Sequence, residues 1–230
     1  MKNFNSLFAI LLLTFFMTQK LKAQDWPNLN KYQKENLALS TPTVGQNRVV
    51  FMGDSITEFW STVDGTYFQG KPYVNRGISG QTTPQMLIRF RADVIDLKPS
   101  VVVILAGIND IAGNTGPATL DMITNNIFSM VELAKAHKIK VVLCSVLPAF
   151  DFPWKPNQQP ADKITALNEI LINYADTNNL VYLDYYATMV DERKGLQAEY
   201  SEDGVHPNKR GYQVMEPFAD NAIALALSMK

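Results

Sequence analysis

Ser55, Asp203 and His206 are the residues whose types could together activate a nucleophile. A histidine can take the proton of a serine hydroxyl, and a carboxylate can hold that histidine in the required tautomer. Asp203 precedes His206 by three residues, in a loop ahead of the last helical segment. These groups could transfer an acyl group through the serine oxygen. A surface turn is the alternative for residues 203–207 taken alone.

The choice of a general base is narrow because the chain contains only two histidines. His137 lies at the end of a helical segment, where the helix dipole stabilises a solvated, charged imidazole. A metal site needs more ligands than Asp203 and His206 provide, and no cysteine or second histidine adds to them. We therefore expect His206 to be the base and expect neither a metal nor another cofactor.

Ser55 follows Gly53 and Asp54 at the end of a short apolar run. The glycine permits a sharp turn, and a serine at a strand-to-helix junction directs its N–H out of a helix N-terminus, where negative charge is favoured. The alternative is that Ser55 only caps the helix. Two further groups could donate hydrogen bonds to an oxyanion near Ser55: the Asn109 amide and the Gly80 N–H. Asn109 could equally be a turn residue, and a loop glycine needs no function.

From about residue 48, short apolar runs alternate with longer amphipathic segments. Continuous apolar runs are typical of parallel strands that are covered on both faces; they lie at 48–52, 101–106, 141–146 and 180–183. Helical periodicity covers 83–97, 119–137, 162–174 and 212–229, whereas 75–82 is expected to be a loop. The alternation predicts an α/β fold, a three-layer α/β/α sandwich with a mainly parallel central sheet. Functional sites of such sheets lie beyond the carboxyl ends of the strands, where Ser55 and Asn109 fall.

The N-terminus predicts export. Lys2 precedes an apolar run at 7–17, and Ala23 follows a polar stretch, as in a secretory signal peptide. We therefore divide the chain into a signal peptide (1–23), a lead-in segment (24–47) and one domain (48–230). The lysines and leucine at 20–22 leave an uncleaved anchor as the alternative. After cleavage we expect a periplasmic or secreted protein without a stable membrane span.

Composition excludes one class of partner and one type of nucleophile. The 230 residues carry a net charge of −1 with both signs interspersed, so no basic surface for a nucleic acid is indicated. Cys144 is the single cysteine and lies within an apolar run, where a thiol acts as a small hydrophobic group. Stability must therefore come from the core rather than from disulfides.

Four blocks of this sequence together resemble the SGNH hydrolases, also called GDSL-type esterases and acylhydrolases. The blocks are Gly53-Asp54-Ser55, Gly77-Ile78-Ser79-Gly80, Gly107-Ile108-Asn109-Asp110 and Asp203-Gly204-Val205-His206. Their order and rough spacing match over about residues 48–225, and Ile56 stands where the family name has leucine. The resemblance implies a flavodoxin-like sandwich that needs no cofactor. It also implies a triad of Ser55, His206 and Asp203, and an oxyanion hole formed by the Ser55 and Gly80 N–H groups and the Asn109 side chain.

The substrate is indicated less directly by the sequence. Phe150, Phe152 and Trp154 follow the third strand and could stack on a sugar, line an acyl pocket or only pack their loop; Trp60 has the same alternatives. A compact chain without a lid-like insertion favours short acyl groups, and an exported enzyme would meet glycans. We therefore expect an esterase that cleaves short-chain esters, O-acetyl first, of small molecules or carbohydrates. A lysophospholipase-like acylhydrolase or thioesterase is the alternative, followed by a non-catalytic carbohydrate-binding domain.

Overall fold

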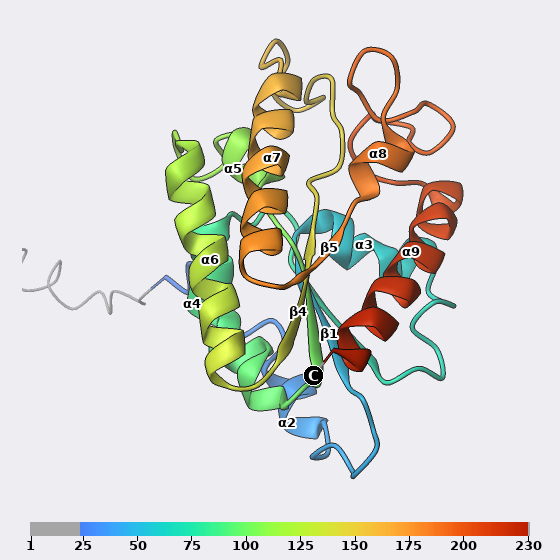
Figure 1. Ribbon diagram of the computed structural model, residues 1–230. Coiled ribbons are helices and arrows are strands. Elements are labelled where there is room, and N and C mark those ends of the chain that lie inside the picture. The colour runs from blue at the N-terminus through green and yellow to red at the C-terminus, as the bar shows by residue number, and fades with distance from the viewer. Residues whose placement is uncertain (1–23, 230) are drawn as a thin grey trace, which may run out of the picture.

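Five parallel strands form the sheet at the centre of the computed structural model, which describes residues 24–229 (Figure 1). The predicted signal peptide therefore lies outside the described residues. The strand order is β2-β1-β3-β4-β5, the order of flavodoxin-like sheets. In chain order the strands are β1 (Val49–Gly53), β2 (Tyr73–Gly77), β3 (Val101–Leu105), β4 (Lys140–Cys144) and β5 (Val181–Leu183).

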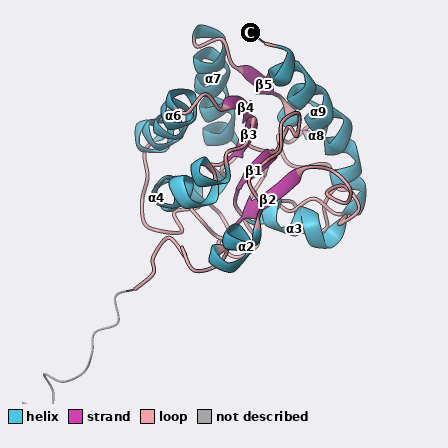
Figure 2. Cartoon of the chain, turned by 90° about the horizontal axis from the view of Figure 1, so that it is seen from below, coloured by secondary structure: helices cyan, strands magenta, loops and turns pink. Residues whose placement is uncertain are grey.

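Helices cover both faces of the sheet, as the view along the layers shows (Figure 2). One face carries α4 (Thr83–Asp93), α6 (Leu120–Ala136) and α7 (Ala161–Thr177), and the other carries α3 (Ser55–Val63) and α9 (Lys209–Ser228). Shorter elements connect them: α2 (Gln33–Ala38), the 3₁₀ turn η1 (Ile95–Leu97), α5 (Ile108–Ile111) and α8 (Tyr185–Met189). The predicted three-layer α/β/α sandwich is confirmed.

The main difference from the sequence prediction is β2, whose last residues were expected to belong to a loop. This strand lies at the edge of the sheet, and its first three residues are only half-buried. Asn75 and Arg76 therefore interrupt the apolar run by which a central strand is recognised. The helix predicted over 83–97 ends at Asp93 and continues as η1.

The register of the central strands brings two loops together. β1 and β3 are fully buried, and Gly53 at the end of β1 pairs with Leu105 at the end of β3. Ser55 lies two residues after β1, and Gly107 lies two residues after β3. Because parallel strands end at the same edge of a sheet, the segments that contain these residues emerge side by side. The apolar core thus determines where the polar residues meet.

Gly77 allows β2 to lie directly beneath α3. A Cβ atom at this position would lie 2.2 Å from the Glu58 backbone nitrogen and 2.7 Å from the Asp54 carbonyl oxygen. Both atoms belong to the beginning of α3, which cannot move without moving Ser55. The close approach of strand and helix therefore requires glycine.

We expect Gly77→Ala to destabilise the fold by about 3 kcal/mol, because the added methyl group meets rigid backbone. Gly45→Ala is the matched control: Gly45 has a φ of +85° but no neighbour within 4 Å of an added Cβ. Backbone strain alone should cost about 1 kcal/mol there. Urea unfolding of both variants measures the difference, and equal losses would contradict the steric explanation.

Candidate active site

Ser55, His206 and Asp203 form a continuous chain of hydrogen bonds. The Ser55 Oγ lies 2.9 Å from the His206 Nε2, and the His206 Nδ1 lies 2.6 Å from the Asp203 Oδ2. A carboxylate accepts hydrogen bonds, so the proton of the neutral ring belongs on Nδ1, and Nε2 can accept the serine proton. The serine and the histidine are 151 positions apart in the chain. Their side chains are therefore arranged as a nucleophile, a base and an orienting acid require.

The loop of Asp203 and His206 is held by its own hydrogen bonds. The Asp203 Oδ1 accepts the N–H groups of Val205 (2.9 Å) and His206 (2.8 Å), and the Ser201 hydroxyl donates to the His206 carbonyl oxygen (2.7 Å). Partial burial alone would raise the pKa of Asp203, but the hydrogen bonds from the His206 ring and from these two N–H groups lower it below its usual value. The carboxylate therefore stays ionised and continues to orient the ring.

Two aromatic rings flank the imidazole. The Phe59 and Trp154 rings have their centroids 5.3 and 5.8 Å from that of His206. Phe59 was not singled out from the sequence, although it lies four residues after Ser55 and hence on the same face of α3. Contact with both rings restricts the movement of the imidazole, which helps to keep Nε2 directed at Ser55.

The expected oxyanion donors line one open hollow of about 230 Å³ beside the serine, formed by Ser55, Ser79, Gly80, Asn109, Asn114, Trp154 and His206. The Asn109 amide donates to the Gln81 carbonyl oxygen (3.1 Å), which leaves one of its two N–H bonds for a ligand. The Asn114 amide donates to the Asn109 Oδ1 (2.9 Å) and to the Gly80 carbonyl oxygen (3.2 Å). Asn114, which the sequence analysis missed, therefore links the two donors.

Of the four aromatic residues predicted to bind substrate, only Trp154 lines this hollow, with 47% of its surface exposed. Phe150 is exposed and lines a neighbouring hollow of about 300 Å³ that also touches Asp203. Phe152 is buried and stacks beneath Trp154, with ring centroids 5.2 Å apart. Trp60 is buried between Tyr67 and Tyr212 in the core. Burial thus favours the packing alternative for Trp60, whereas Phe152 supports the Trp154 ring and also lines the neighbouring hollow.

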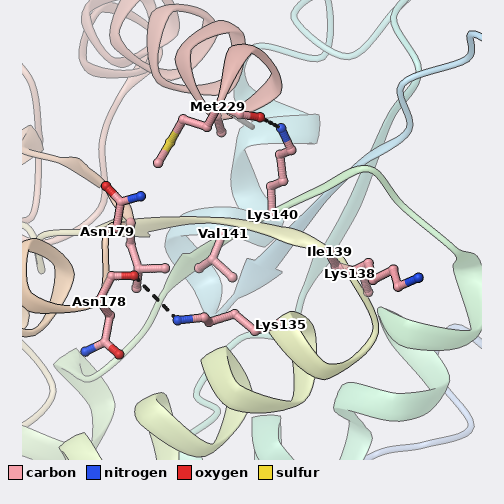
Figure 3. A pocket seen from close by; sticks show the side chains of 10 residues that line it. Lys135, Lys138, Ile139, Lys140, Val141, Asn178, Asn179 and Met229 are labelled. Atoms are coloured by element: carbon pink, nitrogen blue, oxygen red, sulfur yellow. Dashed lines mark hydrogen bonds between the residues drawn. The ribbon is translucent and has the colours of Figure 1, made fainter.

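A hollow of about 360 Å³ lies at the opposite end of the sheet, where β4 and β5 begin (Figure 3). Lys135, Lys138 and Lys140 line it together with Asn178 and Asn179, and Lys140 donates to the Met229 carbonyl oxygen. None of the predicted site residues lies there. Within residues 24–229, no group of three or more His, Cys, Asp or Glu side chains is arranged to hold a metal ion.

Comparison with known proteins identifies relatives over most of the chain. The model of the GDSL-like Lipase/Acylhydrolase family matches residues 51–214. The crystal structure of a Bacteroides fragilis protein, provisionally assigned as an acylhydrolase, is 48% identical with a TM-score of 0.87, covering 89% of this chain and 100% of the other.

Two curated proteins match more distantly. Esterase TesA of Pseudomonas aeruginosa is 32% identical over 135 residues, which are 58% of this chain and 60% of the esterase. The uncharacterized lipoprotein YqeF of Bacillus subtilis is 30% identical over 124 residues, 46% of this chain and 51% of the lipoprotein. The chain thus spans little more than half the length of these curated relatives.

Asp54 is a carboxyl group buried directly beside the nucleophile. Its Oδ1 accepts the Ile56 N–H (3.0 Å), and among the described residues its Oδ2 has no hydrogen-bond partner. Burial raises the pKa of Asp54 to about 7, although the hydrogen bond from Ile56 opposes the shift. A free carboxyl group in the unfolded chain has a pKa of about 3.9. Folding therefore favours the protonated form.

Asp54→Asn should make the fold progressively more stable, relative to the parent chain, as the pH rises from about 4 to 7. The folded protein binds this proton more tightly than the unfolded chain, so ionisation costs stability over that range, on the order of a few kcal/mol in total. Asparagine keeps the Oδ1 acceptor and never ionises. Urea unfolding at pH 4, 6 and 8 measures the difference, with Asp96→Asn at an exposed carboxyl group as the control. A difference in stability between Asp54→Asn and the parent chain that stays constant or shrinks as the pH rises would contradict the raised pKa of Asp54.

Proposed function

Because the chain belongs to the GDSL-like lipase/acylhydrolase family, the SGNH hydrolases, we propose that it is a serine esterase with Ser55 as nucleophile, His206 as general base and Asp203 as the acid that orients the base. One observation carries this proposal: the Ser55 Oγ lies 2.9 Å from the His206 Nε2. Distant parts of the chain meet at that point, where a serine hydroxyl and an imidazole can exchange a proton. A capping serine and a surface turn would not need this contact.

The reaction follows from the roles of these groups. The Ser55 oxygen attacks the ester carbonyl carbon while the His206 Nε2 takes the hydroxyl proton. The negative oxygen that forms is stabilised by the Ser55 and Gly80 N–H groups and by the Asn109 amide. His206 then gives its proton to the leaving alcohol, and the acyl group stays on Ser55. A water molecule, deprotonated by His206, releases the acid and restores the serine.

The substrates that fit best are short acyl esters, acetyl first, carried on carbohydrate. The hollow beside Ser55 is small and open, and Ser79, Asn109 and Asn114 give it hydrogen-bonding walls. A half-exposed Trp154 ring at its edge offers a flat apolar surface of the kind on which sugar rings stack. A long acyl chain would instead gain from an extended apolar channel. Lysophospholipid hydrolysis is the alternative that the assay below separates, and thioester hydrolysis is a further alternative.

We also propose that the protein acts after export, with residues 1–23 as its signal peptide. The match to a Bacillus subtilis lipoprotein supports a location outside the cytoplasmic membrane. None of the helices between residues 24 and 229 is long and apolar enough to cross a membrane. The lead-in segment 24–47 and the domain 48–230 would then form the mature enzyme.

Ser55→Ala should lower the kcat for p-nitrophenyl acetate by roughly 10⁶-fold, because removing the nucleophile removes the acyl-enzyme route. Alanine at this position keeps the backbone N–H and the fold, so thermal unfolding should change little. Steady-state kinetics on the purified variant measure the loss. Turnover close to that of the parent enzyme would end the assignment of Ser55.

The substrate proposal predicts that kcat/KM decreases from p-nitrophenyl acetate to the octanoate, and that acetylated xylan releases acetate. Trp154→Ala should raise the KM for the acetylated polysaccharide several-fold while the KM for p-nitrophenyl acetate changes little, since only the sugar stacks on the ring. Because the ring also contacts His206, any loss of kcat should be similar for the two substrates. Phe218→Ala, at an exposed aromatic residue on α9, is the matched control. A rate that rises steadily with acyl length would favour the lysophospholipase-like alternative.

A further inference from the structure

The proposed oxyanion donor Gly80 lies in a tight turn. The Gln81 N–H donates to the Ile78 carbonyl oxygen (3.2 Å), which closes a four-residue turn over Ile78, Ser79, Gly80 and Gln81. Gly80 is the third residue and has a φ of +75°, the conformation that a type II turn requires and that glycine adopts without strain. The direction of the Gly80 N–H is set by the plane of the Ser79–Gly80 peptide. The contacts that fix the conformation of this turn therefore also fix the direction of the Gly80 N–H.

Glu58 holds this turn from the nucleophile's own helix. Its Oε2 accepts the Ser79 N–H at 2.5 Å. Glu58 follows Ser55 by three residues, so both side chains lie on the same side of α3. One carboxylate thus connects the helix that carries the nucleophile with the residue directly before the oxyanion donor.

Lys31 of the lead-in segment pairs with this carboxylate. The Lys31 Nζ forms a salt bridge with the Glu58 Oε1, and the two side chains are 28% and 25% exposed. A negative charge this close to the turn would oppose the negative oxygen that forms in the reaction. The ammonium group neutralises it while leaving Oε2 free to accept the Ser79 N–H. Lys31 lies outside the family match, which begins at residue 51.

The rest of the lead-in segment contacts both ends of the same turn. The Tyr32 hydroxyl donates to the Gly77 carbonyl oxygen just before the turn. The Gln81 side-chain amide, at the end of the turn, donates to the Pro27 carbonyl oxygen (2.7 Å). Lys31 therefore belongs to a stretch of chain that is already fixed against this loop, and its ammonium group is held in place at little further entropic cost.

From these contacts we propose that Glu58, neutralised by Lys31, is a positioning residue that keeps the Gly80 N–H directed at the oxyanion. The proposal rests on the esterase function above and adds two residues to its machinery. Neither touches the reacting atoms; both act through the Ser79–Gly80 peptide. Loss of the positioning should therefore lower kcat, because the donor is needed most in the transition state, and should leave KM nearly unchanged.

Glu58→Ala should lower the kcat for p-nitrophenyl acetate by about 10- to 30-fold, less than the 10²–10³-fold loss of a whole oxyanion donor. Glu58→Gln keeps an acceptor for the Ser79 N–H and should stay within about 3-fold of the parent. Lys31→Met leaves the carboxylate uncompensated and should cost about 3- to 10-fold, whereas the double variant Lys31→Met/Glu58→Gln should recover most of that loss. Rates are divided by the concentration of protein whose Ser55 reacts with a fluorophosphonate. Unfolded protein, which has no activated serine, is thus left out of the rate.

Lys194→Met, which breaks an exposed ion pair with Asp162, is the matched control and should change neither kcat nor KM. A Glu58→Ala enzyme whose kcat per labelled site stays within 2-fold of the parent would overturn the proposal, as would a loss confined to KM. If Glu58→Ala does not fold, the two single variants Lys31→Met and Glu58→Gln are compared with the double variant. Losses of kcat that add in the double variant would overturn the proposal. Ser55→Ala tests the esterase function separately, since an active Ser55→Ala protein would overturn that function whatever Glu58 does.

Discussion

The arrangement of the site depends on the hydrogen bonds that the Arg89 guanidinium donates. This group is fully buried and donates to the Gly53 carbonyl oxygen at the end of β1 (2.9 Å), to the Arg76 carbonyl oxygen in β2 (2.8 Å) and to the Gln81 side chain (2.5 Å). A buried charge is tolerated only when it is paired and hydrogen-bonded, and Asp93 supplies the counter-charge at 3.0 Å. Because the acceptors belong to β1, to the edge strand β2 and to the turn that contains Gly80, one side chain connects all three.

The histidine loop reaches the same place through the opposite layer. It precedes α9, and the Tyr212 hydroxyl of α9 donates to the Ile56 carbonyl oxygen of α3 (2.8 Å). This buried contact joins the helix that follows His206 to the helix that begins at Ser55. Ser55, the proposed nucleophile, is therefore fixed twice, by Arg89 from one face of the sheet and by Tyr212 from the other. Such double fixation suits a reaction in which a small displacement of the reacting groups costs much of the rate.

The parts of this structure that follow from local pattern could be predicted from the sequence, and the parts that depend on tertiary contacts could not. The buried strands at Val49 and Val101 show as continuous apolar runs. His206 stands out because the chain has only two histidines, and Ser55 because it follows Gly53 at the end of such a run. Packing and substrate binding stayed open for Trp60, which lies five positions after Ser55, about 140° around the helix and therefore toward the core. Phe59, at four positions, lies beside the imidazole instead. Lys31 could not be assigned to the site at all, since its partner is 27 residues away.

The proposed reaction forms a negative oxygen, and four carboxyl groups lie close to the site, each in different surroundings. Burial raises the pKa of Asp54 to about 7 and raises that of Asp110 despite the hydrogen bonds from Thr83, so both shifts favour the neutral form. Asp203 remains ionised, but its charge is directed at the imidazole that becomes positive during the reaction. Glu58 is paired with Lys31, which lies outside the residues matched by the family model. Each of these carboxyl groups accepts a backbone N–H that fixes a loop or the start of a helix. Their hydrogen-bonding geometry is thus common to all four, whereas burial, an ion pair or the imidazole determines the surroundings of the charge.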